Sequence, residues 1–183
     1  MAVATCLDKL ATLIEYLDGL TERPPLDELE RQIRALDVTA DDLAEVSRFN
    51  DAGYIRNLIH GGKWHHLLIL CWRSGQRSPI HNHAGSVCGF RVLKGTGTET
   101  VFESTPSGVI KAVSSHDLPV GTINATQDSD IHQVSNCQAA GEDLITLHVY
   151  SPPLLRMDTY SLTDRTIGEF RPTFLEHSFG SGI

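Results

Sequence analysis

Histidines carry the clearest chemistry in this sequence. His81 and His83 stand two positions apart in the β-like stretch SPIHNHAGSVCGF. Alternate residues of a strand point to one face of a sheet, so both imidazoles can reach a single metal ion. His132 lies in a later β-like run, IHQVSN, and His148 lies in LITLHVYS. A sheet closed into a barrel would bring these side chains into one cavity and create a metal site.

The charge of such a site affects which partners its metal accepts. Three imidazoles without a carboxylate form a neutral ligand set, and imidazole binds Fe, Zn, Cu and Ni alike. The metal stays more positive than in an iron site of two histidines and a carboxylate, which favours an anionic ligand such as a thiolate. The other histidines lack this context, and we interpret them as surface or structural residues: His60, His65, His66, His116 and His177.

Short strands are the elements that must position these histidines. From about Gly53 onward, β-rich runs alternate with turn residues, as in an antiparallel sandwich or barrel. Residues 95–98 and 106–108 have the composition of hairpin turns. We therefore expect a β-barrel over residues 53–160, followed by a weakly patterned C-terminal extension over 161–183.

Residues 1–50 have a helical pattern. Apolar residues follow helical spacing on both sides of a break at 24–25, namely Leu10, Leu13 and Leu17, then Leu29, Ile33 and Leu36. Thr39 and Asp42 resemble a capping box, which predicts a third short helix through Leu43 and Val46. We expect these helices to pack as a lid over one face of the barrel, within a single domain that spans residues 1–183.

Composition excludes several classes of protein. The net charge of −8 over 183 residues argues against a nucleic-acid-binding surface. No apolar run is long enough for a transmembrane helix, and the N-terminal residues lack the basic start of a secretory signal. Four scattered cysteines form no disulfide framework, which predicts reduced thiols in the cytoplasm. Three of them, Cys6, Cys71 and Cys137, read as buried or inert.

Two segments resemble the motifs of the cupin superfamily. The first has Gly75, then His81 and His83, then Cys88 where many cupins carry a glutamate ligand, and ends at Gly95. The second runs from Pro119 through His132 to Asn136, with a longer internal gap than usual. This resemblance implies a mainly β fold, the double-stranded β-helix or jelly-roll barrel, with the N-terminal helices packed on it.

A more specific resemblance covers most of residues 53–160. The segments YIRNLI, LLILCW, SPIHNHAGSVCGFRVLKGTGTETVF, IHQVSN and LHVYSPP occur in the order and spacing typical of the cysteine dioxygenase family. The resemblance implies Fe(II) bound by His81, His83 and His132. It also implies the oxidation of L-cysteine by dioxygen to cysteine sulfinate.

The same resemblance implies roles for five other side chains. Arg56 would pair with the substrate carboxylate, with Tyr54 as a secondary substrate contact. Tyr150 would place its hydroxyl near the substrate, and His148 would support that hydroxyl through a hydrogen bond. Cys88 would form a thioether crosslink with Tyr150, and the Ser151–Pro152 peptide bond would be cis. A bidentate guanidinium suits a carboxylate better than lysine does.

Two positions depart from the family pattern. Thr146 stands where serine is frequent, and its hydroxyl preserves a relay through His148 to Tyr150. Met157 stands where animal enzymes have a cysteine near the pocket, which implies a bacterial type of pocket.

Other functions remain open from the sequence. A thiol dioxygenase acting on 3-mercaptopropionate would resemble this chain, although such relatives usually carry glutamine at the position of Arg56. A non-catalytic metal-binding cupin would not need Arg56, His148 and Tyr150, and a zinc-dependent cupin isomerase commonly keeps a carboxylate ligand. We expect no nucleic-acid or membrane partner, and a monomer or weak homo-oligomer.

Overall fold

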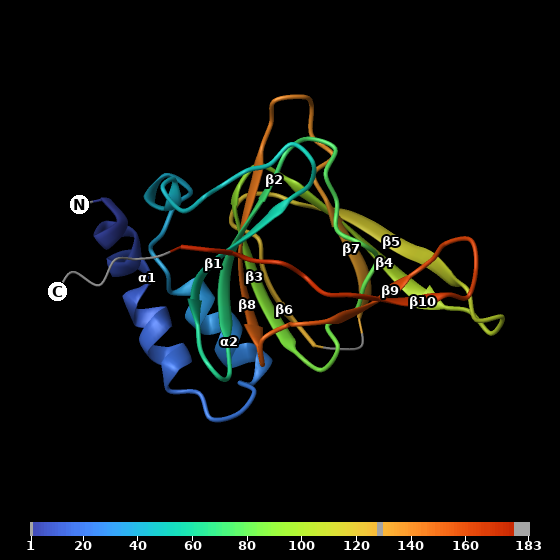
Figure 1. Cartoon of the computed structure of the whole chain (residues 1–183), viewed down its shortest axis with the longest axis horizontal. Coiled ribbons are helices and arrows are strands. Elements are labelled where there is room, and N and C mark those ends of the chain that lie inside the picture. The colour runs from blue at the N-terminus through green and yellow to red at the C-terminus, as the bar shows by residue number, and fades with distance from the viewer. Residues whose placement is uncertain (1, 128–129, 178–183) are drawn as a thin grey trace.

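A helical layer covers one side of a two-layer β structure (Figure 1). The computed structural model describes residues 2–127 and 130–177. Its helices are α1 (Ala2–Asp18), α2 (Leu26–Arg34) and the 3₁₀ helix η1 (Asp41–Leu43). Its strands are β1 (Ile55–Gly61), β2 (His66–Trp72), β3 (Val87–Lys94), β4 (Gly97–Ser104), β5 (Ile110–Leu118), β6 (Ile123–Thr126), β7 (Ile131–Ser135), β8 (Leu144–Ser151), β9 (Met157–Tyr160), β10 (Ile167–Phe170) and β11 (Leu175–Glu176). None of the described helices has the length and apolar character needed to span a bilayer.

The strands form three sheets. Six strands make the largest, in the order β11-β1-β2-β8-β3-β6, and β5-β4-β7 and β10-β9 make the other two. Figure 1 shows the three-stranded sheet facing the six-stranded sheet on the side away from the helices. The described strands hydrogen-bond as separate sheets and not as one closed barrel, which is consistent with the predicted double-stranded β-helix. The double-layer arrangement still encloses a space between the two larger sheets.

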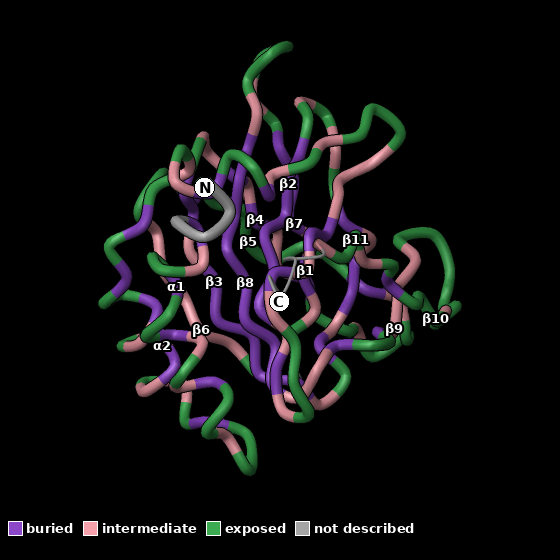
Figure 2. Tube along the Cα trace, turned by 60° about the vertical axis from the view of Figure 1, so that its left-hand side comes forward, coloured by how far each residue is buried: buried purple, intermediate pink, exposed green. Residues whose placement is uncertain are grey.

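Strand β8 is the central strand that separates the helix-facing core from the cavity. All its residues are buried, and it is paired on both edges, with β2 and β3 (Figure 2). Its alternate residues Leu147 and Val149 pack in a cluster with the helices, whereas His148 and Tyr150 face the space between the sheets. Alternation along one strand thus points apolar side chains toward the helices and the histidine and tyrosine into the cavity.

A glycine lets α2 lie close to the sheet. A Cβ at Gly89 of β3 would come within 2.6 Å of the Ile33 side chain and 2.9 Å of the Leu29 side chain. Leu29 and Ile33, both fully buried, belong to one apolar stripe of α2. Any side chain at Gly89 would therefore push the helix away from β3.

The third helix is shorter than predicted. Thr39 and Asp42 do form the expected reciprocal contacts, with the Thr39 amide donating to Asp42 Oδ2 at 2.9 Å and the Asp42 amide donating to Thr39 Oγ1 at 3.3 Å. Only one 3₁₀ turn is helical, and turns follow it, in which the Leu43 carbonyl accepts from the Val46 amide at 3.1 Å and from the Ser47 hydroxyl at 2.9 Å.

The C-terminal part is more structured than its weak pattern indicated. Strands β9 and β10 pair with each other, and β11 pairs in parallel with β1 at Asn57 and Leu58. The predicted hairpin turns are confirmed between β3 and β4 and between β4 and β5, where Gly95 and Gly108 have φ of 75° and 85°.

Candidate metal centre and substrate pocket

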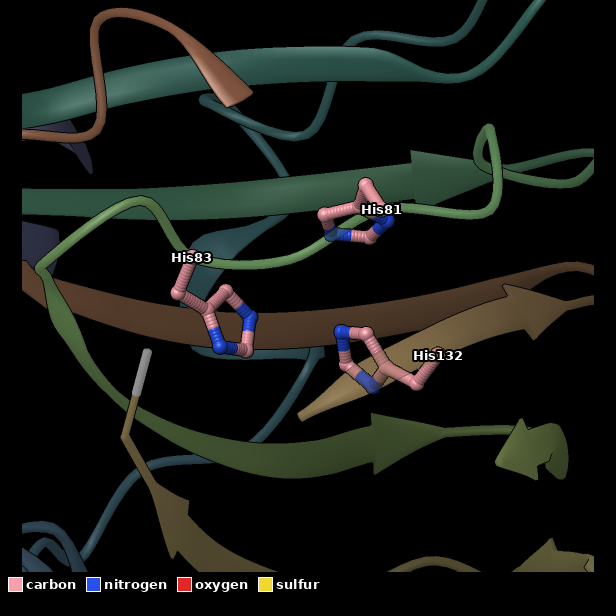
Figure 3. Close-up of side chains that lie close together, drawn as sticks. All are labelled: His81, His83 and His132. Atoms are coloured by element: carbon pink, nitrogen blue, oxygen red, sulfur yellow. The ribbon is translucent and has the colours of Figure 1, made fainter. Parts of the chain in front are cut away.

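Three buried histidines meet between the two larger sheets. His81, His83 and His132 point toward one another, with one ring nitrogen of each within 4.8 Å of the others (Figure 3). The ring centroids of His81 and His132 are 4.7 Å apart, and those of His83 and His132 are 4.8 Å apart. The structure thus brings together the three side chains that the sequence selected as metal ligands.

The segment that carries two of these histidines is a loop rather than the expected strand. His81 makes isolated bridges to His132 and to Thr159, and its amide and carbonyl both bond to the backbone of His132 at 2.9 Å. Residues 84 and 85 then turn with positive φ, at Ala84 and Gly85. The β-like spacing was correct for the side chains, but a pair of backbone hydrogen bonds, not a strand, holds them there.

His81 and His132 each use one ring nitrogen in a hydrogen bond and leave the other for a ligand. His81 Nδ1 bonds to the Pro79 carbonyl at 2.9 Å, and His132 Nδ1 bonds to Glu99 Oε1 at 2.6 Å. His132 Nε2 and both ring nitrogens of His83 are buried without a well-aligned hydrogen bond to the described residues. Buried imidazole nitrogens without partners are costly unless a ligand satisfies them, so the site fits a metal ion.

Burial also sets the charge of the imidazoles. It lowers the pKa of His81 and of His83 well below the ordinary value, and the neighbouring histidines lower both further. Both rings are therefore neutral near pH 7, which is the form that binds a metal.

Glu99 contacts the histidine cluster, and the sequence reasoning missed it. It is 5% exposed, bonds to His132 and also pairs with His116 Nε2 at 3.1 Å. Burial raises the pKa of Glu99, but His132 and His116 lower it by a larger amount, so the carboxylate stays charged. The sequence TETVFE could have indicated this position, because Glu99 lies two residues after Gly97 on β4 and alternate residues of a strand face the same side, here the buried one. His116, interpreted as a surface or structural residue, supports this carboxylate from the outside.

Arg56 lies on the same cavity without an acid partner. It is 5% exposed, and its Nε and Nη2 atoms have no hydrogen-bond partner among the described residues. Its guanidinium carbon is 5.1 Å from the ring centroid of Tyr150 and 5.4 Å from that of Phe174. Tyr54, stacked on Trp72 at 4.1 Å, lines the cavity beside it. A buried guanidinium with free donors can bind an anion such as a carboxylate.

The polar groups of β8 form a chain beside Cys88. Cys88 and Tyr150 are directly opposed in the β3–β8 pairing. His148 Nδ1 is 3.4 Å from the Tyr150 hydroxyl and 3.8 Å from Cys88 Sγ, and His148 Nε2 is 2.9 Å from Thr146 Oγ1. Burial raises the pKa of the Cys88 thiol to about 12 and also raises that of Tyr150. The predicted relay order is therefore present as contacts, and the Ser151–Pro152 bond is cis as the resemblance implied.

Two further positions differ in how they relate to the cavity. Met157 is fully buried in the cluster that contains Cys88 and Tyr150, but it does not line the cavity itself. Phe174, just before β11, packs on Arg56 and also meets the His66 ring edge-on at 5.1 Å between centroids. No pattern in the sequence marked Phe174, because its place depends on the β11–β1 pairing.

Both polar and apolar side chains line the cavity. Every side chain predicted for the site lines it: Tyr54, Arg56, His81, His83, Cys88, His132, His148 and Tyr150, together with Thr146. Leu70, Phe90, Leu118 and Val134 contribute apolar walls.

Comparison with proteins of known structure supports the fold. An uncharacterized Klebsiella pneumoniae protein with a double-stranded β-helix domain aligns with a TM-score of 0.50 at 17% identity, covering 60% of this chain and 81% of that one. A Thermus thermophilus protein aligns with the same TM-score at 20% identity, covering 60% of this chain and 93% of that one. These similarities show a cupin-type fold.

Comparison of sequences identifies the family. The chain is 31% identical to rat cysteine dioxygenase type 1 over 165 residues, which cover 87% of this chain and 80% of the rat protein. It is 32% identical to the bovine protein over 166 residues, with the same coverage of each chain, and 30% identical to the zebrafish protein over 161 residues. A model of the family described as cysteine dioxygenase type I matches residues 3–163. With the three-histidine cluster and the cupin fold, these matches show that the chain belongs to the cysteine dioxygenase type I family.

Proposed function

We propose that this protein oxidises the thiol of L-cysteine with dioxygen to give cysteine sulfinate. The observation that carries the proposal is that one cavity holds both a three-histidine cluster and a buried arginine without an acid partner. Thiol and carboxylate are the two ends of the substrate, and each has a group of matching chemistry in this cavity.

We infer that the resident metal is Fe(II), held by His81, His83 and His132 through their inward nitrogens. When bound, iron supplies the redox chemistry that joins a thiol to dioxygen. Glu99 would fix the orientation of the His132 ring and make it a better ligand, as carboxylates commonly do for metal-bound histidines. The absence of a carboxylate from the three facing side chains keeps the site receptive to an anionic thiolate.

Arg56 would orient the substrate by binding its carboxylate. Its guanidinium contacts the rings of Tyr150 and Phe174. The side chain would therefore lose little conformational freedom when it binds the carboxylate. The apolar walls exclude water, which strengthens the ion pair. Tyr54 lines the same cavity and would assist.

Tyr150 would bring a hydroxyl to the reacting end, and His148 would hold it there. Burial lowers the pKa of His148 well below the ordinary value, so the ring is a neutral hydrogen-bond partner. Thr146 Oγ1 anchors the other ring nitrogen and also accepts from Trp72 Nε1 at 3.2 Å. The hydroxyl is therefore positioned by a chain of contacts that begins at a buried tryptophan.

Cys88 would join Tyr150 through a thioether. The bond replaces the S–H of Cys88 and one ring C–H of Tyr150, and the two protons and two electrons pass to dioxygen. The direct opposition of the two residues across β3 and β8 supports this reaction. The product would lock the Tyr150 ring.

The four described cysteines are all free thiols, which suits a reducing compartment. We infer on that basis that the enzyme works in the cytoplasm.

Oxygen uptake tests the proposal. Protein loaded anaerobically with Fe(II) should consume dioxygen when L-cysteine is added, and the product should carry two more oxygen atoms than cysteine. Protein loaded with Zn²⁺, which has no redox chemistry, is the matched control and should consume none. 3-Mercaptopropionate shares the thiol and the carboxylate, so its kcat/KM must be measured beside that of cysteine. A higher kcat/KM for 3-mercaptopropionate, or disulfide as the only product, would reject the proposal.

A further inference from the structure

A second group of metal-binding side chains lies outside the cavity. Asp18 ends α1, His60 lies near the end of β1, and His65 immediately precedes β2. One ligand atom from each lies within 4.8 Å of the others. In Figure 1 the end of α1 and the turn between β1 and β2 lie side by side at the lower left, on the helical side of the large sheet.

The distances within this group suit a tetrahedral ion. Asp18 Oδ1 and His60 Nε2 share a hydrogen bond of 2.8 Å, whose proton a bound metal ion would replace, and Asp18 Oδ1 is 3.5 Å from His65 Nε2. Bonds of about 2.0–2.1 Å in a tetrahedral site place neighbouring ligand atoms about 3.3 Å apart. The observed separations bracket that value, so small adjustments of the side chains would complete the geometry.

His65 gives an independent sign of a missing partner. The residue is 1% exposed, and its Nε2 atom is buried without a hydrogen bond while it faces the carboxylate. A Cβ at Gly62 would come within 2.6 Å of His65 Cε1, so glycine at that position leaves space for the ring. Burial lowers the pKa of His65, and Asp18 opposes that effect, so the ring is available in its neutral form.

We propose that Asp18, His60 and His65 bind a divalent late-transition-metal ion, with Zn²⁺ as the best fit. Two imidazoles and a carboxylate are common zinc ligands, and the half-exposed Asp18 leaves the fourth position open to water. The last turn of α1 carries no basic side chain, so a cation there also offsets the negative end of the helix dipole.

Such an ion would tie the helical layer to the large sheet. Asp18 and His60 are 42 positions apart in the chain, and the unfolded chain does not hold them together. Zn²⁺ bound here would therefore favour the folded state by mass action. The next residue, His66, contacts Phe174, and Phe174 packs on Arg56.

Zinc stoichiometry tests the site. Equilibrium dialysis followed by metal analysis should give about two Zn²⁺ per chain, one at the three-histidine cluster and one here. His60→Ala and Asp18→Asn should each bind about one, since a three-ligand site that loses a ligand releases its ion. Both replaced side chains are partly or largely exposed, so the substitutions leave the apolar core intact. Asp8→Asn, the same charge change elsewhere on α1, is the matched control and should retain both ions.

Thermal unfolding gives a second readout. The rise in unfolding temperature caused by Zn²⁺ should be larger for the wild type and Asp8→Asn than for His60→Ala or Asp18→Asn. Equal zinc stoichiometry in the wild type and the two site variants would overturn the proposal, as would equal rises in unfolding temperature. Neither outcome would bear on the proposed dioxygenase activity, because the three-histidine cluster is unchanged in all of these variants.

Discussion

Replacing Arg56 by methionine should lower activity without lowering stability. Methionine has a similar length and is apolar, so it fills the space of the guanidinium while removing its charge. The variant should bind cysteine poorly, because the carboxylate then enters an apolar cavity without a partner. The fold should tolerate the change, because Arg56 has no acid partner among the described residues and burying an unpaired cation is costly.

The size of the loss follows from the contacts of the guanidinium. Its Nε and Nη2 atoms are both free to donate to a carboxylate. A hydrogen bond to a charged group contributes about 1.5–3 kcal/mol, which corresponds to a fall of about 10- to 150-fold in kcat/KM. Methionine also keeps contact with the rings of Tyr150 and Phe174, since thioethers pack well on aromatic rings.

Initial rates of oxygen uptake with cysteine and with cysteamine measure this effect. Cysteamine lacks the carboxylate, so it should be a poor substrate of the wild type and should be little affected by the substitution. Urea unfolding of the metal-free proteins should show no fall in the free energy of unfolding. An equal loss of kcat/KM for both thiols would refute the role of Arg56, and a clear loss of stability would refute the argument that its charge is unpaired.

Three further predictions concern the surroundings of the metal site. Incubation with Fe(II), cysteine and air should lower the intact mass by two hydrogens and yield a branched Cys88–Tyr150 peptide. Cys88→Gly should keep measurable dioxygenase activity, whereas Tyr150→Phe should lose more of that activity. An active preparation with unchanged mass would show that the enzyme works without the link. Glu99→Gln should weaken iron binding by about 10- to 100-fold in equilibrium dialysis, because the His132 ring loses its charged partner; unchanged affinity would remove that role. Iodoacetamide at pH 8 should modify exposed Cys137 well before buried Cys88, whose thiol pKa is raised to about 12, as peptide mapping of the folded protein would show.

The site was predictable where residue type and spacing alone decide it. The i, i+2 spacing of His81 and His83 was interpreted as a strand, and the two side chains do converge although the backbone is a loop. The same spacing rule placed His148 and Tyr150 on one face of β8, which the structure confirms. The i, i+2 spacing therefore predicts which side chains face the same side, even where the backbone is not a regular strand.

Residues whose placement depends on distant pairing could not be predicted. Phe174 reaches Arg56 only because β11 pairs with β1, and two residues of pairing leave no periodic signal. His65 was interpreted as a surface or structural residue. Its proximity to Asp18 could not be predicted, because it depends on how α1 packs against the sheet. Glu99 was overlooked for a different reason, since a glutamate on a strand usually faces solvent, and only the buried histidines explain its inward position.

The parallel pairing of β1 with β11 has a consequence for how the protein folds. Asn57 is paired with Leu175, so the first strand of the large sheet meets the last. Closing so long a loop costs chain entropy before any contact repays it, whereas the β4–β5 hairpin closes over a short turn. The cover that Phe174 provides for Arg56 should therefore form late, after the sheets have assembled. During folding, the Arg56 guanidinium should therefore stay in contact with water until the sheets around it have formed.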